Sequence, residues 1–398
     1  MRADVGALEE RRAIYYASGQ QYAEYFLRYA NDRRDDWPGL EAEHSNLLTA
    51  AQRCRDIGNQ DGLLALREAL QPYLDLQGHW GDSLRLNEWA IAAVEACGDL
   101  VSSARFTHDR ADILHQRGEY RWAEQLYRGA EEAYRTLGEE EMALRSRLMR
   151  ALALRSQGQL VEAERLCEAT AADAQRLGLE RWLAHPLYVR ALLAHDRGDY
   201  QQARRWVDES FSRLVDTDEL AMLAQCHHFL GELALLQGHL DEARHQLEKS
   251  LELSQQVGIL RRVAATRRLL GDLARSEERY KEAQTLYRDV LETARRLGDQ
   301  PQMARTLLSL GQLERHMGQD YEAIIALESA RTIYAEIGDA RGVVIAYLLL
   351  AWLHLRRGEI RQASQMGIKA FKMARKSNLL HLRVLLGTLR RYRMMQGV

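Results

Sequence analysis

The chain has 398 residues, of which 46% are hydrophobic and 28% charged, and it contains only 4 prolines. This composition is typical of a soluble helical protein and argues against extensive turn-rich β structure or disorder. The formal net charge of −2 and the aromatic content of 7% give no reason to expect general binding to nucleic acid or to an anionic membrane.

The sequence carries no recognisable targeting signal. Its first residues, MRADVGALEERRAIYY, lack the apolar core of a signal peptide, and the longest apolar run, Val343 to Leu355, is too short to span a bilayer. The four cysteines lie far apart without a CxxC pair, which is typical of a reducing compartment. We therefore expect a cytoplasmic protein.

Residues 1–57 are expected to form an N-terminal helical pair that continues into the rest of the chain. Residues 8–57 keep the spacing of apolar residues that is typical of helices. They fall outside the regular register that begins after them.

Glycine recurs at a constant interval in two series, and the second series is offset from the first by half of that interval. The first series is Gly78, Gly118, Gly158, Gly198, Gly238, Gly318 and Gly358, with Glu278 in the place of one glycine. The second series is Gly58, Gly98, Gly138, Gly178, Gly258, Gly298 and Gly338, with Asp218 and Asn378 in two places. Asp and Asn tolerate the left-handed conformation that ends a helix, so we expect both to act as glycine does. A different turn is expected at Glu278.

The two series together place a helix-ending residue roughly every 20 residues, which leaves helices of about 17 residues. We expect consecutive helices to pair as helical hairpins. Small residues recur at two fixed phases, and we interpret them as the points where paired helices cross. They are Ser83, Ala123, Ala163, Ala203, Ala243, Ala283, Ala323 and Ala363 in second helices, and Ala111, Ala151, Ala191, Gly231, Gly271, Gly311 and Ala351 in first helices.

These columns resemble the tetratricopeptide repeat, in which an aromatic residue opens the second helix of each hairpin. The openers here are Trp80, Tyr120, Leu160, Tyr200, Leu240, Tyr280 and Ile360. The resemblance implies an all-α, right-handed tetratricopeptide-like α-solenoid of about nine helical hairpins, with residues 58–378 as the repeat array. The repeats are roughly 40 residues long where those of the family have about 34, and they lack its closing proline, so each helix is longer.

The segment that begins at Trp37 resembles the start of the C-terminal helical-repeat sensor region of bacterial STAND signalling ATPases, the class of maltose-type and antibiotic-type regulators. The matching positions are Trp37, Leu40, Glu41, Glu43, His44, Asn46, Leu47, Ala50, Gly78, Trp80 and Trp89. The resemblance implies a sensor arm that receives an inducer or partner. Because the sequence has no G-x-x-x-x-G-K-[ST] loop, no ATP hydrolysis is assigned to it, and it is either part of a larger regulator or a freestanding sensor.

Residues 379–398 are predicted to form a C-terminal capping helix, because the last hairpin of a solenoid otherwise leaves an apolar face uncovered. Its basic residues are interpreted as the solvated side of the cap, with a phosphate or nucleic-acid patch as the alternative. They are Arg390, Arg391 and Arg393, close to Lys369, Lys372, Arg375 and Lys376.

First helices of tetratricopeptide hairpins line a concave groove, so the resemblance implies that their outward residues form the ligand-binding surface. These are Arg105, His108, His115, Arg145, Arg155, His185, Tyr188, His195, His228, Arg268, Arg275, Arg305, Arg315, His316 and Trp352. The excess of Arg and His favours an acidic peptide or partner helix, because guanidinium groups pair with carboxylates bidentately. The alternative is that neighbours such as Arg275 and Asp272 neutralise one another.

No pattern in the sequence indicates catalysis, a cofactor or a metal. There is no HExxH, no nucleophile elbow and no Cys/His cluster at ligand spacing. Cys226, His227 and His228 are consecutive, but neighbours on a helix point about 100° apart and cannot easily share one metal.

The leading hypothesis is therefore a non-catalytic interaction or sensor module that binds a protein or peptide segment in its groove, in bacterial signalling or transcriptional regulation. The first alternative is a small-molecule inducer sensor, with Tyr188 and Trp352 packing the inducer. The second is a self-associating scaffold, so that a homo-oligomer stays possible. Direct binding of nucleic acid or membrane is not expected.

Overall fold

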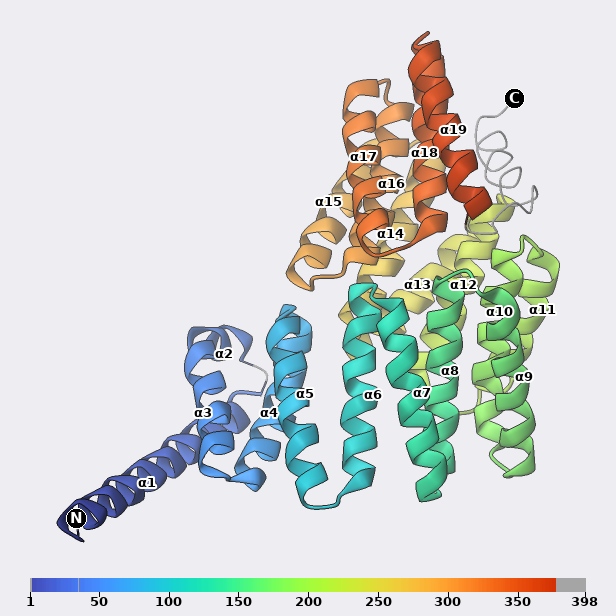
Figure 1. The fold of residues 1–398 in the computed structure, drawn as a ribbon. Helices are drawn as coiled ribbons and strands as arrows, with labels where there is room; N and C mark the ends of the chain where they lie inside the picture. Colours follow the sequence, from blue (N-terminus) through green and yellow to red (C-terminus); the bar gives the residue numbers. More distant parts are fainter. Residues whose placement is uncertain (1, 35, 377–398) are drawn as a thin grey trace. The chain divides into compact units, whose positions relative to one another are not determined.

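The computed structural model describes residues 2–34 and 36–376. In this range the chain forms nineteen α-helices and one short 3-10 helix, with no strand (Figure 1). The all-α, tetratricopeptide-like array of helical hairpins expected from the sequence is confirmed. The predicted capping helix at 379–398 and the expected turn at Asn378 lie outside the described residues.

The helices are separated by short turns along the chain. They are α1 (Arg2–Asp32), α2 (Trp37–Ala42), α3 (His44–Ile57), α4 (Gln60–Gln77), α5 (Trp80–Ala96), α6 (Leu100–Arg117), α7 (Tyr120–Leu137), α8 (Glu140–Ser156), α9 (Leu160–Arg176), the 3-10 helix η1 (Glu180–Leu183), α10 (Ala184–Asp196), α11 (Tyr200–Ser212), α12 (Leu220–Gln237), α13 (Leu240–Val257), α14 (Leu260–Ser276), α15 (Tyr280–Arg296), α16 (Gln300–His316), α17 (Asp320–Glu336), α18 (Ala340–Arg356) and α19 (Ile360–Lys376). From α4 to α19 they pair as eight consecutive hairpins. None of the described helices combines the length and the apolar character needed to cross a bilayer.

The glycine series ends the helices as the sequence predicts. All fourteen glycines of the two series take φ between +57° and +87°. At Gly318, for example, the amide donates to the carbonyl of Arg315 at 3.1 Å, and the next amide, of Gln319, donates to Glu314 at 2.8 Å. These bonds satisfy carbonyl groups that would otherwise have no hydrogen-bond donor at the helix end. They form only when the residue after the helix adopts the left-handed conformation.

Two expectations about the positions where another residue replaces glycine in these series were wrong. Glu278 adopts φ of +59° and the same bonds as a glycine turn, with its amide 3.1 Å from the carbonyl of Arg275. Asp218 is not left-handed, because α11 already ends at Ser212 and the chain turns differently. There the hydroxyl of Thr217 accepts the amide of Glu219 at 3.3 Å, and this local bond replaces the glycine-type helix end.

The small residues mark close helix crossings, as predicted. A Cβ built on Gly231 would lie 2.7 Å from Leu247, and one on Gly311 would lie 2.8 Å from Leu327. On Gly271 it would lie 2.6 Å from the ring of Tyr287. Since real Cβ atoms do not approach so closely, a side chain at these positions would force the two helices of a hairpin apart.

The chain divides into two compact units. Unit 1 holds the described residues of 1–113 and 129–140, and unit 2 holds those of 114–128 and 141–398. In unit 1, helices α1 to α5 share an apolar core around Phe26, Leu40, Leu47 and Tyr73. The sequence boundary expected after residue 57 coincides with the end of α3 and lies inside this unit.

Unit 2 is a run of hairpins that also makes contacts between its distant ends. Consecutive hairpins pack side by side, as α10, α11 and α12 do through the core around Phe229 (Figure 1). The turn at Gly118 comes so close to Ile337 that an added Cβ would lie 2.6 Å from that side chain. Arg341 at the start of α18 donates to Asp196 at the end of α10. The far hairpins of unit 2 therefore touch the near ones.

Candidate ligand-binding surface

Two of the predicted groove residues belong to unit 1 and form local contacts there. The guanidinium of Arg105 is exposed, and it donates to Glu68 at 2.7 Å and lies over the ring of Phe106. The imidazole of His108 is only 1% exposed and has its Nε2 atom 3.7 Å from Asp112. Neither residue joins the larger group described next.

The central residue of that group is Arg305 on α16 in unit 2. Its side chain is exposed and makes no ion pair with any residue that the structure describes. The nearby carboxylates of Asp299 and Asp339 are already engaged, since each caps the helix that follows it and Asp299 also pairs with Arg261 at 2.9 Å. Arg305 thus has an exposed guanidinium without a direct ion pair in the described residues, and Asp299 and Asp339 stabilise its charge from a distance.

The charge of Arg305 reaches side chains on several other helices. Together with burial, which is the larger cause, and with Arg155, it lowers the pKa of His115 to about 4. It also acts on Tyr120 at the start of α7 and on Tyr334 on α17. Arg305 is therefore surrounded by elements that lie far apart in the sequence.

A second arginine without an ion-pair partner in the described chain, Arg262 on α14, lies in the same region. Burial holds the pKa of His228 well below its usual value, and Arg262, Arg268 and Arg305 lower it further. His228 stays neutral and bonds to the hydroxyl of Thr266 at 3.0 Å. Three cations are thus placed around one uncharged imidazole.

Two carboxylates in this region are each shared by two arginines. Asp272 accepts from Arg268 at 2.7 Å and from Arg275 at 3.4 Å. Asp196 accepts from Arg155 at 2.6 Å and from Arg341. Neutralisation of arginine by neighbouring acids, one of the two alternatives drawn from the sequence, does occur here at both carboxylates.

We call this region the Arg305 surface. It consists of Arg155, Arg262, Arg268, Arg305 and Arg341 with His115 and His228.

Other predicted residues of unit 2 serve mainly in packing. Tyr188 is only 6% exposed and lies edge-on to Phe229, and His195 is equally buried against the same ring. His185 lies against Trp182, with its Nε2 atom 3.4 Å from Glu219, and burial lowers its pKa. Arg145 is exposed and engaged with a neighbouring group.

Three predicted residues gather near the end of α16. Arg315 is 8% exposed, lies 4.6 Å from the centre of the Trp352 ring and has its Nη2 atom 2.7 Å from His316. Burial, followed by Arg315 and Arg275, lowers the pKa of His316 to about 4. These contacts form a cation–π cluster that holds α16 against α18.

The sequence did not single out Arg262, Arg341, Asp196 or Tyr334. Arg341 lies in the first turn of α18, outside the phase used to choose groove residues, and Tyr334 lies on α17, a second helix of a hairpin. Arg262 lies in the first turn of α14, where the same phase gives no candidate. Arg341 and Asp196 meet only because α18 contacts α10, whereas Arg262 and Tyr334 lie on helices that pack directly against α16.

In unit 1, three side chains that can ligate a metal converge. His44, His79 and Asp82 each place one ligand atom within 4.8 Å of the others. Their positions, on α3, before α5 and on α5, follow no metal motif in the sequence. Only the packing of α3 against α5 brings them together.

Models of the tetratricopeptide repeat match residues 182–256, 222–296, 262–336 and 302–376, and a further one matches residues 144–169. Together these matches cover more than half of the chain. The chain belongs to the tetratricopeptide-repeat family. No curated protein sequence matches it.

Several solved structures are similar to this chain. The Rap conjugation gene regulator of plasmid pLS20, in complex with the Phr* peptide, is 13% identical with a TM-score of 0.62, over 81% of this chain and 96% of that one. The Cut9–Hcn1 complex of the APC/C is 13% identical with a TM-score of 0.53, and the match covers 96% of this chain and 74% of that one. At these identities the likeness concerns the fold alone.

A STAND ATPase with a tetratricopeptide-repeat sensor, from Pyrococcus horikoshii, is also similar. It is 14% identical with a TM-score of 0.45, over 90% of this chain and 54% of that one.

Proposed function

We propose that unit 2 is a non-catalytic interaction module that binds an acidic peptide or protein segment at the Arg305 surface. The observation that carries the proposal is the exposed guanidinium of Arg305, which has no ion-pair partner in the described residues. A cation in this position gains most from a carboxylate of a ligand, since bidentate arginine–carboxylate bonds are among the stronger polar contacts in proteins.

The charges around Arg305 support an anionic ligand. Arg262 adds a second cation without an ion-pair partner in the described chain, and the single carboxylate of Asp196 is shared by Arg155 and Arg341. Burial and these cations keep His115 and His228 neutral, so the local positive charge comes from arginine and does not depend on pH near neutrality.

The family supports a peptide or protein as the ligand. The Rap regulator of plasmid pLS20 shares the fold and was solved with a bound peptide. By this analogy we infer a cytoplasmic signalling or regulatory role for the present chain, in which occupancy of unit 2 reports the presence of its partner. The small-molecule alternative is weakened, because Tyr188 is buried against Phe229 and offers no accessible ring.

A peptide-binding experiment tests the proposal. Fluorescein-labelled decapeptides rich in glutamate, and the same peptides with every Glu replaced by Gln, are titrated with the full chain, and anisotropy is recorded at low and physiological salt. We expect the acidic set to bind at least tenfold more tightly. Arg305→Glu should remove this preference, because it reverses the charge at the centre of this surface.

Arg165→Glu is the matched control. Arg165 lies on α9, its side chain is 72% exposed, and its contact with Glu162 is a weak surface pair. This variant should bind as the unmodified chain does. Equal affinity for the Glu and Gln peptides, or unchanged binding by Arg305→Glu, would overturn the proposal.

A further inference from the structure

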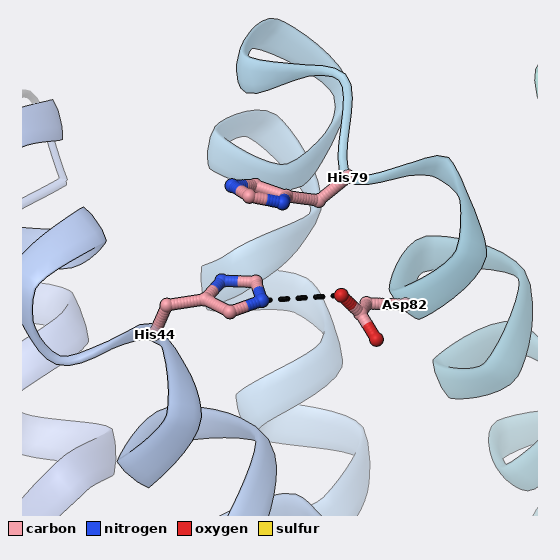
Figure 2. A group of neighbouring side chains, drawn as sticks. All are labelled: His44, His79 and Asp82. Atoms are coloured by element: carbon pink, nitrogen blue, oxygen red, sulfur yellow. Dashed lines mark hydrogen bonds and ion pairs between the residues drawn. The ribbon is translucent and has the colours of Figure 1, made fainter.

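Five polar side chains of unit 1 form one connected cluster. Glu41 lies on α2, His44 begins α3, Tyr73 lies on α4, His79 precedes α5 and Asp82 lies in its first turn. The imidazole of His44 points toward Asp82, and the ring of His79 lies over that of His44, with 4.1 Å between ring centres (Figure 2). Side chains from four consecutive helices and the turn before the last of them thus meet at one point.

The hydrogen bonds of the cluster fix where its protons lie. The carboxylate of Glu41 can only accept, and it lies 2.7 Å from the hydroxyl of Tyr73 and 2.9 Å from Nε2 of His79. Tyr73 therefore donates its one proton to Glu41, and His79 donates its Nε2 proton to the same oxygen. Both bonds lower the pKa of Glu41, that from His79 more strongly.

The tautomer of His44 follows from the hydrogen bonds of Tyr73. Because the Tyr73 proton is committed to Glu41, the Tyr73 oxygen accepts from Nδ1 of His44 at 2.9 Å. The other ring nitrogen of His44, Nε2, faces Oδ2 of Asp82 at 3.1 Å, and Nδ1 is the ring nitrogen of His79 that Glu41 does not use. These two nitrogens and Oδ2 of Asp82 are the ligand atoms available to an ion.

The other oxygen of Asp82 is already occupied. Nη2 of Arg85 donates to Oδ1 at 2.6 Å, which leaves Oδ2 directed at His44. Arg85 thus orients the carboxylate so that Oδ2 is turned toward His44. A cation at the centre of the three donors would satisfy all of them.

We propose that His44, His79 and Asp82 bind a divalent transition-metal ion of the zinc class. The separation of 3.1 Å between Nε2 of His44 and Oδ2 of Asp82 is close to the edge of a tetrahedron with metal–ligand bonds of about 2.0 Å. Two imidazoles and one carboxylate leave a fourth position for water or for a group of a partner. The His79 ring must tilt out of its stack on His44 to direct Nδ1 at the ion.

The partners behind the ligands are those that metal sites use. A histidine ligand characteristically donates its second ring proton to a carboxylate or another acceptor, which fixes its tautomer and orientation. Here His79 is bound to Glu41 and His44 to Tyr73. The ligand side chains of His44 and Asp82 are 19% exposed and that of His79 is 25% exposed, so an ion can reach them from solvent.

The competing occupant is a second proton on His44, which would turn the contact with Asp82 into an imidazolium–carboxylate pair. A metal and this proton exclude each other, since both require the Nε2 lone pair.

Cobalt(II) provides a direct test on the full chain after dialysis against EDTA. We expect one Co²⁺ per chain, with the intense visible absorption of a four- or five-coordinate site, and displacement of this absorption by one equivalent of Zn²⁺. Zn²⁺ should also raise the melting temperature, because it binds only the folded arrangement. Substituting Asp82→Asn, His44→Ala or His79→Ala should weaken Co²⁺ binding at least tenfold.

His239→Ala is the matched control. His239 occupies the same place in its hairpin as His79, immediately after a left-handed glycine and before the second helix, but no group of three metal-capable side chains forms around it in the described chain. Circular dichroism of each variant verifies folding. Absent Co²⁺ absorption, equal Co²⁺ uptake by Asp82→Asn, or nitrogen NMR showing His44 doubly protonated with millimolar Zn²⁺ present would each overturn the site. Peptide binding by unit 2 is measured separately and does not enter this result.

Discussion

Arg341 donates a hydrogen bond to the carboxylate of Asp196, although 145 residues separate the two. Arg155 binds the same carboxylate at 2.6 Å, and only 7% of the Asp196 side chain is exposed. Burial alone would raise the pKa of Asp196, but the two guanidinium groups lower it well below its usual value. One buried ionised carboxylate thus joins hairpins that are far apart in unit 2.

Asp196→Asn should loosen this connection. The substitution keeps the size of the side chain but leaves Arg155 and Arg341 without their counter-charge, which we expect to cost about 2–4 kcal/mol. Urea denaturation at pH 7 measures the loss. Asp208→Asn is the control, because the 50% exposed carboxylate of Asp208 pairs with Arg204 at the surface and should contribute less than about 1 kcal/mol. Equal effects of the two substitutions would contradict this role of Asp196.

Glu278→Gly should stabilise the protein. Glu278 is held at φ of +59°, a left-handed conformation that costs a residue with a Cβ about 1–2 kcal/mol. Part of this gain is lost because glycine makes the unfolded chain more flexible, so we expect a net gain of about 0.5–1 kcal/mol. The reverse change at the equivalent turn, Gly318→Ala, should destabilise by a similar amount, since Gly318 has φ of +78°. A loss of stability in Glu278→Gly would show that the glutamate side chain contributes more than the strain costs.

His115 should make stability depend on pH. Its pKa is about 4 in the folded chain, mainly through burial, against about 6.5 when unfolded. Above pH 6.5 the residue is neutral in both states and its full contribution is present. As pH falls from 6.5 to 4 only the unfolded chain takes up the proton, so stability declines by up to about 3 kcal/mol.

Denaturation curves of His115→Phe measured between pH 7 and pH 4 isolate this contribution. Phenylalanine keeps a ring against Tyr120 and Tyr127 but takes up no proton. The variant should lose less stability over this range than the unmodified chain does. The side chain of His239 is 61% exposed, so His239→Phe should leave the pH dependence unchanged. If both variants follow the original curve, His115 is not a source of the pH dependence.

Gly271→Ala tests the helix crossings. The added methyl group would meet the Tyr287 ring at 2.6 Å, and this ring is fixed by its bond to Asp272. We expect a loss of about 1–3 kcal/mol from overpacking, measured by thermal unfolding. Gly129→Ala, where a Cβ meets nothing within 4 Å on α7, should stabilise its helix instead. If Gly271→Ala left the stability unchanged, the two helices of this hairpin would be able to move apart without a loss of stability.

The hairpin array could be predicted because its determinants are local. A left-handed glycine ends each helix, and a small residue such as Gly311 faces its partner helix only a few residues away in the same hairpin. Glu278 was misjudged because sequence position alone does not show when neighbouring contacts force a strained conformation. Asp218 was misjudged because the hydroxyl of Thr217 offered the backbone a different turn.

The candidate site was harder to predict, because it depends on contacts between hairpins. Helix phase places Tyr188 and His228 on inner helices but does not tell that neighbouring helices bury them. Helix phase also does not predict Arg341, which reaches the site only because the start of α18 contacts the end of α10. His44 and Asp82 likewise meet only through the packing of α3 against α5.

The close approach of Gly118 to Ile337 limits how unit 2 can evolve. Open repeat arrays lengthen and shorten readily, because each module touches only its immediate neighbours. Here a duplication or deletion of one hairpin between Asp196 and Ile337 would separate Ile337 from Gly118 and Arg341 from Asp196. The number of modules in this segment is therefore constrained by geometry, and natural variation in length should be found at its outer ends.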